Sequence, residues 1–133
     1  MRKILFVLFA IGIIFSCSGQ KSSGAAGLYV EVTAKEANEL IKSVNPFILD
    51  VRTDAEYATG HIPNSTVIPV QILSENLDKL EEYKDMPIFV YCRSGNRSTT
   101  ASKILIEEGF TKVYNLKNGI GDWQNQGLPI VTD

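Results

Sequence analysis

Cysteine and histidine are scarce in this sequence. The 133 residues include two cysteines, Cys17 and Cys92, and one histidine, His61. This count excludes a disulfide framework. It also argues against a zinc site, which needs about four cysteine or histidine ligands. We therefore expect no metal ion in this protein.

An excess of basic residues is absent as well. The 13 Lys and Arg residues are outnumbered by 15 Asp and Glu residues, and the formal net charge is -2. Nucleic-acid-binding domains carry a basic face that neutralises phosphates. The composition therefore argues against a nucleic-acid partner. Hydrophobic residues make up 44% of the chain, which is ordinary for one globular domain of this length.

Long hydrophobic runs are limited to the N-terminus. The chain starts with Met1, Arg2 and Lys3, and an apolar run follows at residues 4–15, broken only by Gly12. A membrane-spanning helix needs about 20 apolar residues, whereas a basic start before a shorter apolar run is typical of a secretory signal peptide. We predict that this segment directs export.

The end of this run has the sequence IFSC at residues 14–17. It resembles the lipobox of bacterial lipoproteins, in which an aliphatic residue lies three positions before the cysteine and a small residue directly before it. The resemblance implies that residues 1–16 are a lipoprotein signal peptide, cleaved before Cys17, and that Cys17 carries a lipid anchor. The alternative is an ordinary signal peptide that is cut near Ala25 or Ala26 and removes Cys17.

Residues 17–27 contain no large apolar side chain. Such a composition is typical of a flexible tether between an anchor and a folded domain. We therefore expect a domain over residues 28–133 that is exported and held at a membrane of the periplasm or cell envelope. With Cys17 acylated, Cys92 is the only free thiol, so dithiol exchange of the thioredoxin type is excluded.

From residue 28 onward, short apolar runs alternate with helical patterns. The strand-like runs lie at residues 28–32, 47–51, 66–69, 87–92 and 112–116. Helical patterns lie between and after them, and the first begins with a predicted capping box of Thr33 and Glu36. Alternation at this spacing predicts an α/β fold, with a parallel sheet of about five strands flanked by helices on both faces.

Cys92 closes the most hydrophobic of these runs, and a polar loop with the sequence CRSGNRS spans residues 92–98. In parallel sheets the functional crevice lies beyond the carboxyl ends of the strands. Gly95 can adopt positive φ, so N–H groups of the loop can converge at the start of a helix. Together with Arg93 and Arg97 they favour an anionic sulfur, which predicts a reactive thiolate. The alternative is a buried cysteine that only closes a core strand.

Three stretches of the chain resemble the signature motifs of rhodanese-like (sulfurtransferase) domains. They are LDVR at 49–52 followed by EY at 56–57 and GHIP at 60–63, YCRSGNRS at 91–98, and LKNGI at 116–120 followed by Trp123, Gly127 and Pro129. The resemblance covers about residues 28–131 and implies a rhodanese-like fold.

The resemblance also implies a sulfurtransferase. In rhodaneses the cysteine thiolate takes a sulfane sulfur from a donor such as thiosulfate, and the resulting persulfide passes it to cyanide or a thiol. Carried over to this sequence, Cys92 is the catalytic residue and the only site of covalent chemistry. The rest of the loop is expected to bind the substrate: Arg93, Ser94, Gly95, Asn96, Arg97 and Ser98. No metal or organic cofactor is implied, and we expect a monomer.

Charged residues around the motifs are given different roles. Arg93 and Arg97 are expected to frame the entrance and attract an anionic donor. An aspartate at a strand end beside an arginine is usually an ion pair that holds adjacent loops, so Asp50 and Arg52 are interpreted as structural support. The same interpretation is given to two further residues, Glu56 and His61. Trp123 is expected to pack the last helix against the sheet.

Other functions were weighed against sulfur transfer. Phosphate-handling enzymes of the Cys-x5-Arg type need five residues between cysteine and arginine, but four residues separate Cys92 from Arg97. The shorter loop forms a smaller cradle that suits a single sulfur atom, so a phosphatase is disfavoured. Two alternatives stay open: a persulfide carrier or partner-binding module, and a redox sensor that uses Cys92 alone.

Overall fold

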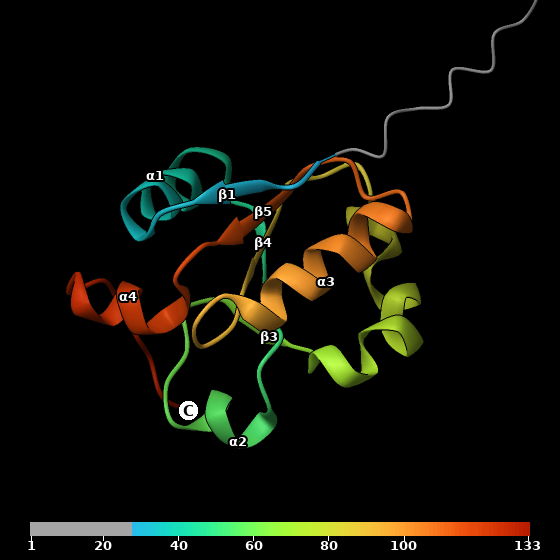
Figure 1. The fold of residues 1–133 in the computed structure, drawn as a ribbon. Coiled ribbons are helices and arrows are strands. Elements are labelled where there is room, and N and C mark those ends of the chain that lie inside the picture. Colours follow the sequence, from blue (N-terminus) through green and yellow to red (C-terminus); the bar gives the residue numbers. More distant parts are fainter. Residues whose placement is uncertain (1–27) are drawn as a thin grey trace, which may run out of the picture.

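Five parallel strands form the central layer of the molecule in the computed structural model, which describes residues 28–133 (Figure 1). The predicted signal peptide, Cys17 and the predicted tether lie outside the described residues. In chain order the elements are β1 (Val30–Val32), α1 (Ala34–Val44), β2 (Phe47–Asp50), α2 (Asp54–Ala58), β3 (Ser65–Val67), η1 (Val70–Tyr83), β4 (Ile88–Tyr91), α3 (Asn96–Glu107), β5 (Val113–Leu116) and α4 (Gly119–Asn125).

The strand order β1-β5-β4-β2-β3 places β4 in the middle of the sheet. β4 pairs in parallel with β2 on one side and with β5 on the other, so that Val90 lies between Leu49 and Asn115. All four residues of β4 are buried. Because the carboxyl ends of parallel strands meet at one edge of the sheet, the residue after β4, Cys92, comes to the centre of that edge.

Helices cover both faces of the sheet, as predicted. In Figure 1, α1 and α4 lie on one side of the sheet, and α3 and η1 lie on the other. On the first side, Phe89 packs in one core cluster with Trp123, and on the second side Val90 packs in another with Leu105. Adjacent residues of β4 therefore point into different cores, which explains why this strand is a continuous apolar run.

Capping boxes start both α1 and α2. At α1 the Thr33 hydroxyl accepts a hydrogen bond from the Glu36 N–H, and the Glu36 carboxylate accepts one from the Thr33 N–H, as predicted. Thr53 and Glu56 repeat the arrangement at α2. Because the second box holds the Glu56 side chain at the first turn of α2, it also determines where that carboxylate can reach.

The segment between β3 and β4 differs from a regular α-helix. The leucine spacing over residues 73–80 predicts a helix, and the chain winds there as a 3-10 helix over Val70–Tyr83. The Asn76 side chain donates to the Ile72 carbonyl at 2.7 Å, and this is the carbonyl that the Asn76 N–H would use in an α-helix. This local competition favours the tighter winding.

The C-terminal segment folds back onto the turn that follows α2. His61 and Val131 exchange two backbone hydrogen bonds of 2.9 Å each. Trp123 is buried, as expected for the last helix, and its Nε1 donates to the Pro129 carbonyl at 2.9 Å. The C-terminus consequently lies beside α2 (Figure 1).

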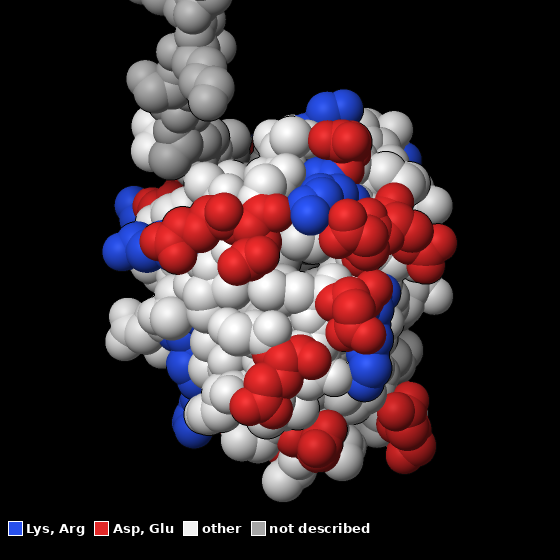
Figure 2. All heavy atoms as spheres, turned by 90° about the vertical axis from the view of Figure 1, so that its right-hand side faces the viewer, with Lys and Arg blue, Asp and Glu red and all other residues white. Residues whose placement is uncertain are grey.

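Acidic side chains outnumber basic ones on the face shown in Figure 2. η1 contributes four exposed acidic residues to the surface: Glu75, Asp78, Glu81 and Glu82. This face lacks the basic character of a nucleic-acid-binding surface. Of the helices within residues 28–133, none has both the length and the hydropathy to cross a membrane.

Candidate active site

Cys92 lies directly after β4, and its side chain is only 1% exposed. It starts the loop that leads into α3. The Cys92 carbonyl accepts a hydrogen bond from the Ile120 N–H at 2.9 Å, and the Arg93 carbonyl accepts one from the Gly121 N–H at 3.3 Å. The loop is thereby attached to the first turn of α4, so the sulfur is held where β4, α3 and α4 meet.

Hydrogen-bond partners surround the sulfur of Cys92. The Gly95 N–H donates to Sγ at 3.1 Å, and the Ser98 hydroxyl lies 3.5 Å from it. Burial acts to raise the pKa of the Cys92 thiol, but contacts with Ser98 and with the N–H groups of Gly95 and Ser94 outweigh it and lower this pKa below its ordinary value. These contacts favour the thiolate form of Cys92. Ser94 and Asn96 themselves are exposed.

Gly95 is required by the close approach of two backbone segments. Its φ is +106°, and a Cβ at this position would lie 2.2 Å from the Lys117 carbonyl oxygen. From the opposite segment, a Cβ on Gly119 would lie 2.2 Å from the Arg93 carbonyl oxygen. No side chain fits between the Cys92 loop and the segment from Lys117 to Gly119. The close packing of these two segments therefore fixes the direction in which the Gly95 N–H points, toward Sγ of Cys92.

A hydrogen-bond chain that the sequence analysis did not single out holds Gly95 from the α3 side. The Gly95 carbonyl accepts from Ser98 Oγ at 3.1 Å and from Thr99 Oγ1 at 2.8 Å. Asn115, buried in β5, donates from Nδ2 to Thr99 Oγ1 at 3.2 Å. The sequence did carry a signal for Asn115, because a carboxamide inside an apolar strand needs a hydrogen-bond partner.

Asp50 and Arg52 form the predicted ion pair at the end of β2. Nε and Nη2 of Arg52 lie 2.7–3.0 Å from the Asp50 carboxylate oxygens, and the two side chains are almost fully buried. Arg52 Nη2 also donates to the Gly60 carbonyl at 2.8 Å. The pair therefore ties the end of β2 to the turn after α2. Removing one partner of such a buried pair is strongly destabilising.

His61 lies in the same turn and contacts α2 and the C-terminus. Its Nδ1 lies 3.0 Å from the Tyr57 carbonyl oxygen, and its ring stacks on the Tyr57 ring with centroids 3.7 Å apart. Its Nε2 lies 3.5 Å from the Asp133 carboxylate. None of these partners belongs to the Cys92 loop. This placement agrees with the interpretation of His61 as a structural residue.

Arg97 is paired with Glu56 across the mouth of the loop. The two guanidinium nitrogens donate to the two carboxylate oxygens at 2.7 and 2.8 Å. This bidentate contact is the main reason why the pKa of Glu56 falls from 4.5 to about 2. The pair also balances the charge of Arg97, one of the two arginines that the sequence predicts to attract an anionic donor. The other, Arg93, has no ion pair within residues 28–133.

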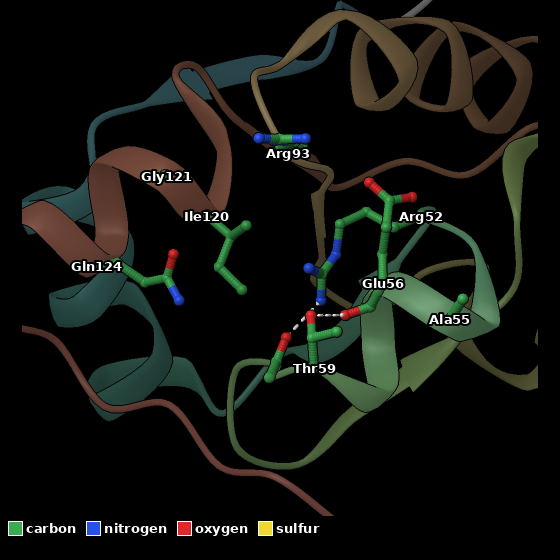
Figure 3. A pocket seen from close by; sticks show the side chains of 9 residues that line it. Arg52, Ala55, Glu56, Thr59, Arg93, Ile120, Gly121 and Gln124 are labelled. Carbon is green, nitrogen blue, oxygen red and sulfur yellow. Dashed lines mark hydrogen bonds between the residues drawn. The ribbon is translucent and has the colours of Figure 1, made fainter.

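A cleft of about 580 Å³ opens beside the loop, between α2 and α4 (Figure 3). Its walls come from the end of β2, from α2 and the following turn, from the Cys92 loop and from α4: Arg52, Ala55, Glu56, Thr59, Gly60, Arg93, Ile120, Gly121 and Gln124. Arg93 is shared by the cleft and the Cys92 loop. Within the described part of the chain, no group of three or more His, Cys, Asp or Glu could hold a metal ion.

Comparison with known proteins assigns a family to this arrangement. The family model described as the rhodanese-like domain matches residues 33–126, which include the Cys92 loop. The chain belongs to the rhodanese-like domain family. The resemblance inferred from the three motifs is thereby confirmed, and so is the fold.

Individual relatives of this rhodanese-like domain have different names. A sulfurtransferase of Allochromatium vinosum is 36% identical over 95 residues, which cover 71% of this chain and 87% of that protein. A tRNA uridine(34) hydroxylase of Enterobacter sp. (strain 638) is 33% identical over 105 residues, which cover 73% of this chain but 30% of that protein. The crystal structure of a rhodanese-related protein from Thermoplasma volcanium has a TM-score of 0.71 and 35% identity, covering 79% of this chain and 100% of that chain.

The close backbone contact at Gly95 predicts a severe effect of Gly95→Ala. We expect a loss of at least about 3 kcal/mol in the free energy of unfolding, because the new Cβ meets backbone that cannot move away. Gly127→Ala is the matched control, since Gly127 also has positive φ, +70°, but nothing lies within 4 Å of its Cβ position. It should cost only about 1 kcal/mol. Urea denaturation of both variants measures the difference in the free energy of unfolding. Equal losses would contradict the conclusion that the close backbone contact requires glycine at position 95.

The contact between Ser98 and Cys92 predicts that Ser98→Ala raises the pKa of the Cys92 thiol, because the hydrogen bond between the two side chains acts to lower this pKa and is lost in the variant. The measurement is the pH dependence of alkylation of Cys92, followed by peptide mass spectrometry. Ser102→Ala is the control, since Ser102 lies on the same helix and its buried hydroxyl has no hydrogen-bond partner. An unchanged alkylation midpoint in Ser98→Ala would show that this contact does not tune the thiol.

The pair of Glu56 and Arg97 predicts a pH-dependent stability. Because the pKa of Glu56 is lowered from 4.5 to about 2, its stabilisation is complete above about pH 4.5 and is lost as the pH falls toward 2. At neutral pH we expect Glu56→Gln to cost about 1–2 kcal/mol, and the difference from wild type should shrink below pH 4.5. Denaturant unfolding at a series of pH values tests this. Glu36→Gln, in the capping box of α1, provides the control, since Glu36 forms no ion pair within the described residues.

Proposed function

We propose that this rhodanese-like domain is a sulfurtransferase, which moves a sulfane sulfur from a thiosulfate-type donor to a thiophilic acceptor through a persulfide on Cys92. The observation that carries the proposal is the sulfur of Cys92, held under the Gly95 N–H at 3.1 Å with a lowered pKa. The name of the Allochromatium vinosum relative, a sulfurtransferase, supports it.

The first step loads the cysteine. The Cys92 thiolate attacks the outer, sulfane sulfur of thiosulfate, a new S–S bond forms, and sulfite leaves with the electron pair of the broken S–S bond. The charge then lies on the terminal sulfur of the persulfide. Loop N–H groups such as that of Gly95 stabilise this charge as an oxyanion hole does.

The second step discharges the persulfide. Cyanide or a thiolate attacks the terminal sulfur, the S–S bond to Cys92 breaks, and its electron pair returns to Cys92 as the thiolate. No proton has to be removed in either step when the nucleophiles are already ionised. The mechanism therefore needs no separate general base, which accords with the placement of His61 away from the Cys92 loop.

The geometry of the loop supports sulfur transfer over phosphate chemistry. Four residues lie between Cys92 and Arg97, and the Arg97 guanidinium is already engaged by Glu56 in a bidentate contact. A guanidinium engaged in this way is not free to form the bidentate contact with phosphate that arginine often makes. The similarity to the tRNA uridine(34) hydroxylase covers 30% of that protein, so it supports only the domain and its loop.

We also propose that the domain is exported and attached to a membrane of the cell envelope by a lipid on Cys17. The proposal rests on the basic start, the short apolar run and the lipobox-like residues 14–17. In this arrangement the domain over residues 28–133 reaches its substrates at the end of the tether formed by residues 17–27.

The proposed function predicts that thiosulfate adds one sulfur atom to reduced wild-type protein and that cyanide removes it as thiocyanate. Cys92→Ser should lower turnover by at least about a thousandfold, because the nucleophile is lost, and should keep the fold. Intact-mass spectrometry and a thiocyanate assay measure both steps, thermal unfolding checks the fold, and Cys17→Ser is the matched control. Retained turnover in Cys92→Ser would refute the mechanism. Loading without discharge would favour a persulfide carrier.

A further inference from the structure

Three donors converge on the carbonyl oxygen of Gly95, at the start of α3. The backbone N–H of Thr99 lies 3.0 Å from this oxygen, the Thr99 hydroxyl 2.8 Å and the Ser98 hydroxyl 3.1 Å. A carbonyl oxygen has two lone pairs, so two of these donors are enough to satisfy it. The Ser98 hydroxyl makes the longest of the three contacts and is the donor that the carbonyl can release.

The Ser98 hydroxyl has a second neighbour, the sulfur of Cys92. In the thiol form, the Cys92 S–H donates to Ser98 Oγ at 3.5 Å, and the Ser98 hydroxyl donates to the Gly95 carbonyl. A thiolate has no proton and only accepts hydrogen bonds, so Ser98 must be the donor when the sulfur is ionised. Because a hydroxyl has one proton, the Gly95 carbonyl then loses its bond from Ser98.

Asn115 fixes the direction of the Thr99 hydroxyl. The Gly95 carbonyl has no proton to give, so the proton between it and Thr99 Oγ1 belongs to Thr99. Thr99 Oγ1 must therefore accept in its other contact, and Asn115 Nδ2, which is a donor only, lies 3.2 Å away. Asn115 is buried, and this is the one hydrogen bond that its side chain makes within residues 28–133. The bonds run in one direction, from Asn115 through Thr99 to Gly95.

From this arrangement we propose that Thr99 is a positioning residue for Cys92, which keeps the Gly95 carbonyl bonded and so releases the Ser98 hydroxyl to donate to the ionised sulfur. Asn115 holds Thr99 in the orientation that this role needs. When Cys92 ionises, its proton passes to water, and the Ser98 hydroxyl turns without breaking a covalent bond. The inference rests on the proposed function, in which Cys92 reacts as a thiolate, and it gives a role to two residues outside the Cys92 loop.

Charged side chains around Cys92 are unchanged by a neutral substitution of Thr99. They lie at the end of β2, on α2, in the loop, at the start of α3, and before and within α4: Asp50, Arg52, Glu56, Arg93, Arg97, Lys117 and Asp122. Within residues 28–133, none of them forms a hydrogen bond with the side chain of Ser98, Thr99 or Asn115. A change in the titration of Cys92 in such a variant therefore reports on hydrogen bonding.

Thr99→Val tests the proposal, because it removes the hydroxyl and keeps the shape of the side chain. The Gly95 carbonyl then retains the Ser98 hydroxyl, and the ionised sulfur loses a donor. We expect the midpoint of the pH dependence of Cys92 alkylation to move upward. At a pH below the midpoint, alkylation should slow about two- to tenfold, the effect of one hydrogen bond. The rate is measured on full-length protein by mass spectrometry of the Cys92 peptide.

Two further substitutions serve as controls for Thr99→Val. Thr99→Ser keeps a hydroxyl at this position and should retain the wild-type midpoint. Thr100→Val should retain it as well, since Thr100 is exposed on the same helix and its hydroxyl contacts only the Asn96 carbonyl, at 3.4 Å. An increase in Thr100→Val as large as that in Thr99→Val would overturn the inference.

A double-mutant cycle shows whether Thr99 acts through Ser98. In Ser98→Ala protein the hydroxyl that Thr99 releases is absent, so the addition of Thr99→Val should leave the midpoint unchanged. An equal effect of Thr99→Val with and without Ser98 would overturn the inference, and so would an unchanged midpoint in Thr99→Val alone. Asn115→Val should raise the midpoint by a smaller amount, because Thr99 keeps its hydroxyl and loses only the donor that orients it. No effect of Asn115→Val would refute the role of Asn115.

Failure of this inference can be told apart from failure of the proposed function. Alkylation needs no sulfur donor, so the double-mutant cycle is decisive whether or not thiosulfate loads Cys92. Where loading occurs, its rate in Thr99→Val should be reduced below the alkylation midpoint and should return to the wild-type rate above it, where both proteins are ionised. A loss of loading that is equal at every pH would show a structural role of Thr99 and would overturn the inference.

Discussion

The site depends on a close contact between two backbone segments, each of which has a glycine at the point of contact. The Cys92 loop and the connection from β5 to α4 approach so closely that Gly95 meets the Lys117 carbonyl and Gly119 meets the Arg93 carbonyl, with no room for a Cβ in either case. This contact aims the Gly95 N–H at the sulfur. It also brings α4 against the loop, which forms one wall of the cleft. A single steric condition thus positions both the thiolate and the surface beside it.

Three arginines, Arg52, Arg93 and Arg97, lie in or near the loop, and they differ in whether an acidic side chain pairs with their guanidinium group. Arg97 is held at both ends of its guanidinium by Glu56, and Arg52 is held by Asp50 and the Gly60 carbonyl. The pair of Glu56 and Arg97 ties α2 to the start of α3, and the pair of Asp50 and Arg52 ties the end of β2 to the turn after α2. Arg93 remains as the exposed cation. A positive charge near an active cysteine is therefore insufficient evidence for a substrate contact, because its partner decides its role.

Much of the molecule could be predicted from local pattern. The alternation of apolar strands and helical stripes, the capping box of Thr33 and Glu36, and the pair of Asp50 and Arg52 depend on residues close together in the chain, and all are present. The sequence predicted fewer of the contacts between segments that are far apart in the chain. The bond from Asn115 to Thr99 and the pairing of Glu56 with Arg97 join residues 16 and 41 positions apart, which no local period reveals.

The sequence by itself determined the α/β class, the position of the single cysteine of the domain at the end of a buried strand, and the short glycine-containing loop after it. These features follow from hydrophobic period and from residue chemistry, which act over a few neighbours. Only the tertiary structure decided which groups face the sulfur, which arginine stays unpaired, and that a cleft lined by Arg93 lies between α2 and α4. Those outcomes depend on how elements remote in the chain pack at one edge of the sheet, and packing is a property of the whole fold.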